Sequence, residues 1–291
     1  MDIDPSLPHD VTNLAGRPSG RLGLDGLVSP FGSLLRSPEL FRRVLLRDLE
    51  STFRGSVLGL LWIVLIPLVM VALYTFVFGV VLKSAWVAQS TSPLEVPLIY
   101  FTGLTISGFF LEVINRAPNF IRQHTSYVKK VIFPLDLLDW VLVGTALVKL
   151  AISFILLAAF LAIVEQRLPL EVIWVPVLVV PLAVMLVGVA WILSAIGTYV
   201  RDLGHALTII SPVIMFVTPV FYSLDQVPEV ARGAYLVNPL TFVLEQARAI
   251  LFFGAGVDWA GYAGYWVAAV IVFWLGFQFF SRARSGFADV I

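Results

Sequence analysis

The sequence RDLESTFRGSVLGLLWIVLIPLVMVALYTFVFGVVLK, residues 47–83, decides the fold. Its first eight residues carry charges of both signs, whereas Tyr74 is the single ionisable side chain between Ser56 and Leu82. At about 1.5 Å of rise per residue, a helix over 56–82 exceeds the ~30 Å hydrocarbon core of a bilayer. The stretch therefore predicts a transmembrane helix.

The residues just before this span, 36–55, predict an amphipathic helix that lies in the lipid headgroup layer. At helical spacing its apolar and charged side chains fall on opposite faces. The apolar face takes Leu40, Phe41, Val44, Leu45, Leu49 and Phe53, and the charged face takes Arg42, Arg43, Arg47, Asp48 and Glu50. The arginines Arg42, Arg43 and Arg47 can hold this helix on anionic lipid.

The composition excludes an ordinary soluble domain, because 59% of the 291 residues are hydrophobic and only 13% are charged. Nineteen basic and nineteen acidic residues cancel, so net charge gives no reason to expect nucleic acid as a partner. The absence of cysteine excludes disulfides, thiol catalysis and thiolate metal sites. We therefore expect an all-α polytopic membrane protein.

Six apolar stretches predict six transmembrane helices. They are residues 56–82, 98–114, 137–164, 172–199, 206–222 and 261–280. Residues 115–134 are expected to form a solvated excursion. Between the last two spans, residues 240–253 predict a short interfacial or re-entrant helix, on which Glu245 and Arg248 are spaced to pair.

The two ends of the chain are expected on the cytoplasmic side of the membrane. Arginine and lysine are concentrated in alternate connections and near both termini, which is the pattern of cytoplasmic segments. Residues 1–35 are interpreted as a mobile cytoplasmic tail, and residues 281–291 as a cytoplasmic C-terminus.

Few residues are candidates for chemistry. The three isolated histidines lack the spacing of a metal site, so no metal and no catalytic residue is predicted. No glycine-rich phosphate loop occurs, so any ATP that the function uses must be handled by a separate partner. Lys149 lies in the middle of a span and has two interpretations. We favour the first, in which it pairs with Glu112 or reaches toward the headgroups, over the second, in which it belongs to a transport path.

Aromatic side chains in the first and fifth spans have two interpretations. Rings that line a passage can stack on sugar faces without one fixed hydrogen-bond geometry. Ordinary helix packing and lipid contact explain the same residues, and composition alone favours that alternative. The rings in question are Trp62, Tyr74, Phe78, Phe216, Phe221 and Tyr222.

Several short motifs, in this order, resemble the membrane subunits of type-2 ABC exporters of bacterial polysaccharides, a group that handles O-antigen, capsule and teichoic acid. These motifs are TFRGSVLGLLW (52–62) followed by Pro67-Leu68, VKKVIFP (128–134), Arg201-Asp202, TPVFY (218–222) and Asn238-Pro239-Leu240. One departure is Ile66, where the family more often has a polar residue.

The resemblance implies a homodimer that encloses a continuous passage and is driven by two copies of a separate ATPase, which would bind ATP and magnesium. The cargo would be a polyprenyl-pyrophosphate-linked polysaccharide that leaves the cytoplasm across a bacterial inner membrane. Arg42, Arg43 and Arg47 would either attract its pyrophosphate or only hold their helix on anionic lipid. The aromatic rings above lie in stretches that match passage-lining helices. Residues matching the elements that couple to the ATPase are Phe120, Arg122, Tyr127, Lys129, Lys130, Arg201 and Asp202. Residues matching the outer gate are Asn238, Pro239, Glu245 and Arg248.

Two other functions share parts of this pattern. A type-2 ABC permease for a small lipid or drug would have the same topology without needing a wide aromatic passage. An integral membrane glycosyltransferase or ligase would ordinarily need an acidic or other catalytic cluster on a loop, and none stands out in the sequence.

Overall fold

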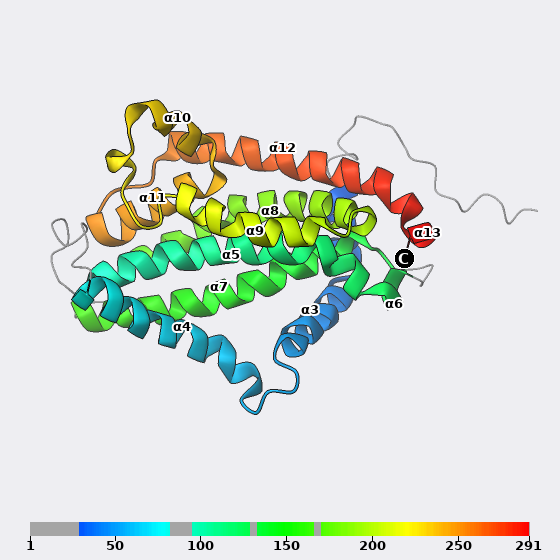
Figure 1. Ribbon diagram of the computed structural model, residues 1–291, viewed down its shortest axis with the longest axis horizontal. Coiled ribbons are helices and arrows are strands. Elements are labelled where there is room, and N and C mark those ends of the chain that lie inside the picture. Colours follow the sequence, from blue (N-terminus) through cyan, green and yellow to red (C-terminus); the bar gives the residue numbers. More distant parts are fainter. Residues whose placement is uncertain (1–28, 82–94, 129–132, 166–169, 291) are drawn as a thin grey trace, which may run out of the picture.

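The computed structural model describes residues 29–81, 95–128, 133–165 and 170–290, and the regular elements in these ranges are helical (Figure 1). Within these ranges five helices are long and apolar enough to cross a membrane. They run over Gly59–Val77, Glu95–Gln123, Asp136–Ile163, Leu170–Tyr199 and Trp259–Gly286. The prediction of an all-α polytopic membrane protein is confirmed.

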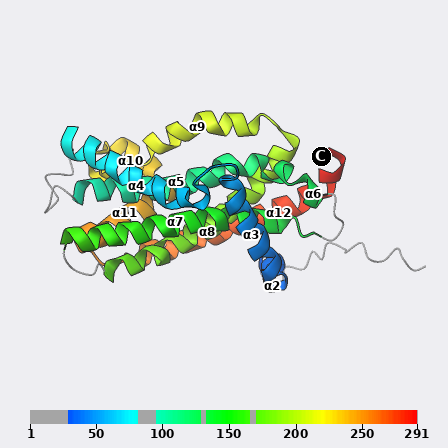
Figure 2. The ribbon, with the colours of Figure 1, turned by 90° about the horizontal axis from the view of Figure 1, so that it is seen from below.

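The same spans supply the main helices of the bundle. Helix α4 is preceded by a 3-10 turn and continued by a π-helical stretch, Thr75–Val81. The main helices are α4 (Trp62–Tyr74), α5 (Glu95–Gln123), α7 (Asp136–Glu165), α8 (Trp174–Tyr199) and α12 (Trp259–Ala283). In Figure 2, α5 lies between α9 (Leu203–Val217) on one side and α7 and α8 on the other.

The closest helix packing is between α8 and α12, where two glycines meet. A Cβ atom added to Gly276 would collide with the backbone of Gly188, and one added to Gly188 would lie 2.5 Å from the Cα of Phe273. Small residues let helix backbones approach in this way inside a membrane, where packing contacts rather than water exclusion hold helices together. This glycine contact fixes α12 against the centre of the bundle.

The predicted amphipathic helix is α3 (Pro38–Thr52), which crosses α7 at one end of the bundle. Phe41 and Leu45 of α3 pack over Gly144 of α7. A Cβ atom added to Gly144 would meet a methyl group of Leu45 and the ring of Phe41. The assignment of Asp48 to the charged face is wrong, because Asp48 is 4% exposed and faces α5. Asp48 can be buried because it pairs with Arg116 of α5, a partner that the spacing of residues within α3 could not predict.

Residues 29–35, predicted as the end of a mobile tail, form the 3-10 turn Ser29–Phe31 and most of helix α2 (Gly32–Arg36). The ring of Phe31 lies 5.4 Å from that of Trp140 and 5.0 Å from that of Phe273. Trp140 also donates a hydrogen bond to the carbonyl of Pro30. The segment is therefore packed on α7 and α12, while residues 1–28 lie outside the described part of the chain.

Helix α5 is longer than predicted. The second span was expected over 98–114 with a solvated excursion after it, but the helix continues to Gln123. Ala117, Pro118, Phe120 and Ile121 are buried in this continuation. Gly197 of α8 permits the close approach, since a Cβ atom there would collide with the backbone of Pro118. Tertiary packing therefore extends a helix whose charges suggested a loop.

The fifth predicted span, 206–222, is helical only as far as Val217. Thr218 adopts φ −89° and ψ 140°, the extended conformation that a residue before proline favours. The chain then continues through two further helices, α10 (Glu229–Val237) and α11 (Pro239–Phe253), and α11 covers the residues 240–253 for which a short helix was predicted. With fifteen residues, α9 is not among the five long spans.

The two ends of the bundle differ in what they carry (Figure 1). One end holds α3, α6 (Thr125–Val128) and α13 (Phe287–Val290), and the opposite end holds α10 and α11. Phe287 is buried against Phe280 and Tyr199, so the C-terminal residues pack on the first of these ends.

Candidate functional site

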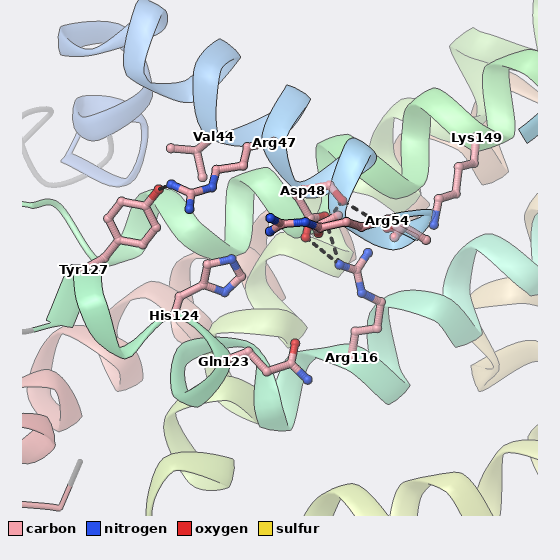
Figure 3. Close-up of a pocket in the computed structure, with 11 residues that line it drawn as sticks. Val44, Arg47, Asp48, Arg54, Arg116, Gln123, His124, Tyr127 and Lys149 are labelled. Carbon is pink, nitrogen blue, oxygen red and sulfur yellow. Dashed lines mark hydrogen bonds and ion pairs between the residues drawn. The ribbon is translucent and has the colours of Figure 1, made fainter. Parts of the chain in front are cut away.

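A polar cavity of about 470 Å³ lies between α3, the end of α5 and α7, at the end of the bundle where α6 begins (Figure 3). Four of its lining residues carry a permanent positive charge, and one is a carboxylate. The lining residues are Val44, Arg47, Asp48, Ser51, Thr52, Arg54, Arg116, Gln123, His124, Tyr127 and Lys149.

Four charged side chains join the three helices around this cavity. Arg116 of α5 places one guanidinium nitrogen 2.8 and 2.9 Å from the two carboxylate oxygens of Asp48 on α3. Its other terminal nitrogen lies 3.0 Å from Oε1 of Glu112, one turn earlier on α5. Lys149 of α7 donates to that same oxygen at 2.6 Å, which confirms the predicted pairing of Lys149 with Glu112. The network contains two positive and two negative charges and is neutral.

The end of α3 brings a further arginine to the cavity. Ser51 and Thr52 donate their hydroxyl protons to the carbonyl of Asp48 at 2.9 and 3.0 Å, and the helix ends at Thr52. Gly55 then turns the chain with φ 86°, a conformation that costs other residues about 1–2 kcal/mol. The turn leaves Arg54 on the cavity side of α3, where its side chain joins the lining.

Arg47 and Arg54 give the cavity an excess of positive charge. Within the described ranges, neither guanidinium forms an ion pair with a carboxylate, whereas Asp48 is engaged by Arg116. The closest polar contact of Arg47 is the hydroxyl of Tyr127, at 3.5 Å. His124 directs its Nδ1 to the carbonyl of Phe120 at 2.8 Å, and its ring stacks on Tyr127. Such a site is suited to binding an anion.

A second polar cluster lies at the opposite end, around the non-helical residues 218–221 that follow α9. Arg248 of α11 is 1% exposed and donates to the carbonyls of Pro219 and Val220, the first at 2.6 Å. Tyr100 of α5 donates to the carbonyl of Phe221. These hydrogen bonds satisfy backbone groups that no helix satisfies.

The predicted outer-gate residues all belong to this second cluster or adjoin it. Asn238 caps α11 through the amide of Leu240 and donates its own amide to the hydroxyl of Thr218 at 2.9 Å. Pro239 occupies the first turn of α11, and its carbonyl accepts a hydrogen bond from Tyr265. The predicted Glu245–Arg248 pair is present at 3.8 Å. Burial raises the pKa of Glu245, and it lowers the pKa of Arg248 to about 10, so Arg248 stays charged at neutral pH.

The aromatic residues predicted for a passage fall into two groups. Phe216, Phe221 and Tyr222 lie together, with the first two rings 5.7 Å apart and the Tyr222 hydroxyl bonded to the Phe216 carbonyl. Trp62 and Tyr74 lie on α4, which packs on α5. The side chain of Phe78 lies outside the described part of the structure.

The predicted coupling residues lie at the end of the bundle that carries α6. Arg201 and Asp202 are exposed in the turn between α8 and α9, and Arg122 bonds Asn119 on α5. A Cβ atom added to Gly204 after that turn would lie 2.5 Å from the side-chain amide nitrogen of Asn119, so the turn and the end of α5 touch. Phe120 is fully buried with Arg116 over its ring, and its role in coupling stays a prediction. Lys129 and Lys130 lie outside the described residues.

The three arginines predicted to attract a pyrophosphate do not all line the same cavity. Only Arg47 lines the cavity. Arg42 and Arg43 are exposed elsewhere on α3, and Arg43 faces Glu39 at 3.6 Å. Arg54 and Arg116 were not predicted to belong to this site, although the four-residue spacing of Glu112 and Arg116 indicates a pair on one helix face.

With this geometry established, comparison with known proteins identifies the family. The ABC-2 type transporter family matches residues 39–252, which is most of the chain. The chain belongs to the ABC-2 type transporter family. This ABC-2 chain is 27% identical over 247 residues to the O-antigen export system permease protein RfbA of Myxococcus xanthus, covering 84% of the chain and 92% of the relative. Two proteins of the same name from Klebsiella pneumoniae are 22% identical over 249 and 252 residues, with the same coverage.

The family membership fits a multi-pass membrane protein whose relatives are transport permeases. It also shows that the fold elements on either side of the cavity, from α3 to α11, belong to the shared family region. The resemblance expected from the sequence motifs is confirmed.

Replacing Asp48 by asparagine should destabilise the ABC-2 chain. The change leaves Arg116 without its buried counter-charge, and we expect a loss of about 2 kcal/mol, or a fall of about 5 °C in the melting temperature in nanodiscs. The matched control is Glu39→Gln, which breaks the exposed Glu39–Arg43 pair and should leave the melting temperature unchanged. Equal melting temperatures for Asp48→Asn and the parent chain would contradict the role of the network.

Proposed function

We propose that this chain is the transmembrane subunit of an ATP-driven exporter that moves a polyprenyl-pyrophosphate-linked, O-antigen-like polysaccharide out of the cytoplasm. The observation that carries the proposal is that three relatives, each covered over 92% of its length, are named O-antigen export system permeases. In the described ranges the fold is a helical bundle without a nucleotide-binding domain, so the driving force would come from a separate ATPase.

Six spans are proposed, with α9 and the residues after it as the fifth crossing. Fifteen helical residues reach only about 22 Å, less than the ~30 Å core. The non-helical residues 218–221 would complete the crossing. Non-helical backbone is tolerated at such depth when it is buried in protein, and Thr218, Pro219 and Val220 are buried. The carbonyls of Pro219 and Val220 accept hydrogen bonds from Arg248 of α11, and the carbonyl of Phe221 accepts one from Tyr100 of α5.

A homodimer with a passage between its subunits is proposed from the faces of α4 and α9. Helix α4 is the least buried of the five long spans, and α9 exposes large apolar residues including Ile209, Val213 and Phe216. Exposed apolar surface at membrane depth suits lipid or a second copy of the chain. Trp62, Tyr74, Phe216, Phe221 and Tyr222 on or beside these helices are the rings proposed to contact sugar.

The proposed contact with two ATPase copies uses the end of the bundle that carries α6. Arg122, Tyr127, Arg201 and Asp202, with Lys129 and Lys130, would meet the partner there. Because α5 and the α8–α9 turn touch at Asn119 and Gly204, a push on either would move both as one body. The same end would face the cytoplasm of a bacterium with both termini on that side of its inner membrane.

A deletion experiment tests the proposed function. The gene for this chain, and separately the gene for the candidate P-loop ATPase beside it, is removed, and polysaccharide at the cell surface is measured. We expect surface polymer to disappear in both deletions, to accumulate inside the cell, and to return on complementation. Unchanged surface polymer after deletion of this chain would reject the function.

A further inference from the structure

We propose that the cavity under α3 is a binding site for a phosphate-bearing anion, held chiefly by Arg47 and Arg54. In Figure 3 both arginine side chains extend from α3 and the turn after it over the space that faces α5. The site is more restricted than the basic surface of α3, since it excludes Arg42 and Arg43.

The charges around the cavity argue for an anion rather than a neutral or cationic ligand. Arg116 and Lys149 are already balanced by Asp48 and Glu112 through contacts of 2.6 to 3.0 Å. The balanced network leaves the two exposed guanidinium groups as the excess charge of the cavity. A guanidinium presents several donors in a planar fork, which matches phosphate oxygens better than the single ammonium of lysine does.

The shape of the site argues for a ligand of limited size. The cavity holds about 470 Å³ between α3 on one side and α5 on the other, and it opens to solvent on the side where Arg47 and Arg54 are exposed. Val44 contributes an apolar side chain to the lining, while Gln123 and the ring of His124 add polar groups beside the arginines. A phosphate or pyrophosphate fits these dimensions, and a chain attached to it could leave along α3.

The phosphate can come from two sources, a lipid headgroup or a free anion. The inference rests on the proposed function only for placing α3 at the level of the lipid headgroups. If the phosphate belongs to a lipid, the site holds the charged junction between an isoprenoid tail and the group attached to it. If it is free, the site senses a small soluble anion instead.

Binding measurements on the full chain in phosphatidylcholine nanodiscs, without any ATPase, test the site. The probes are farnesyl pyrophosphate, inorganic pyrophosphate and farnesol, and the pocket variants are Arg47→Gln and Arg54→Gln. We expect each variant to weaken farnesyl pyrophosphate about ten- to hundredfold, the loss expected for a charged hydrogen bond, and to leave farnesol unaffected. Inorganic pyrophosphate with the same affinity and the same losses would assign a free anion, and its failure to bind would assign a lipid.

Matched variants on the same helix give the control. Arg42→Gln and Arg43→Gln remove one positive charge each from exposed positions outside the cavity, and we expect changes below about threefold. All four arginines are exposed, so none of these variants should fail to fold, and melting temperatures verify this. Equal losses in pocket and control variants, or no loss in either pocket variant, would overturn the site. Neither result depends on whether the deletion strains lose surface polymer.

Discussion

Replacing Arg248 by methionine should lower the stability of the chain by about 3–5 kcal/mol, one of the largest effects expected for any single substitution here. Methionine keeps much of the volume but removes both hydrogen bonds to the carbonyls of Pro219 and Val220. It also leaves the half-buried Glu245 without its partner. We expect the melting temperature in nanodiscs to fall by about 10 °C and surface polymer to fall with it.

Arg232 offers a matched control for this substitution. It also donates to two backbone carbonyls, those of Val227 and Asp225, each at 3.0 Å, but near the surface of the protein. Water can replace a donor there, so Arg232→Met should have a small effect. Similar melting temperatures for the two variants would show that Arg248 does not stabilise the non-helical residues 218–221.

Replacing Gly276 by valine should separate α12 from α8. The added side chain would collide with the backbone of Gly188. Unlike a side chain, this backbone cannot move aside by changing its rotamer. Overpacking usually lowers the free energy of unfolding by about 1–3 kcal/mol, and we expect a clash with backbone to cost at least the upper value of this range. We expect little folded protein on fluorescence-detected size-exclusion chromatography.

Gly264 lies on the same helix and supplies the comparison. A Cβ atom at Gly264 has no neighbour within 4 Å among the described residues, so Gly264→Val should accumulate like the parent chain. If Gly276→Val accumulated equally well, the close contact between α8 and α12 would be contradicted.

The long spans are predictable from sequence because a run without charge must be buried in lipid or protein. The third and fourth spans, expected at 137–164 and 172–199, match α7 and α8 within two residues at each end. The extension of α5 through Arg116 and Arg122 was not predictable, because charges near a membrane boundary suggest solvent unless partners are known. Asp48 is one such partner, 68 residues away in the chain.

The candidate site was predictable in part for the same reason. A solitary lysine within an apolar span requires a counter-charge, and this argument led to Glu112. Arg54 gave no comparable signal, because its position depends on the end of α3 and on the positive φ of Gly55. Local pattern identified the charges, and only the packing of three helices showed which charges remain unbalanced.

Reconstitution tests the central claim, that this chain forms a transport path powered by a separate ATPase. The chain and the neighbouring P-loop ATPase are placed in vesicles with a fluorescent lipid-linked polysaccharide, and transfer to the opposite leaflet is measured by protection from an added glycosidase. Transfer should require both proteins and ATP hydrolysis, and should stop when the catalytic carboxylate of the ATPase is removed. Transfer by this chain alone without nucleotide, or no transfer by the hydrolysing complex, would contradict the account.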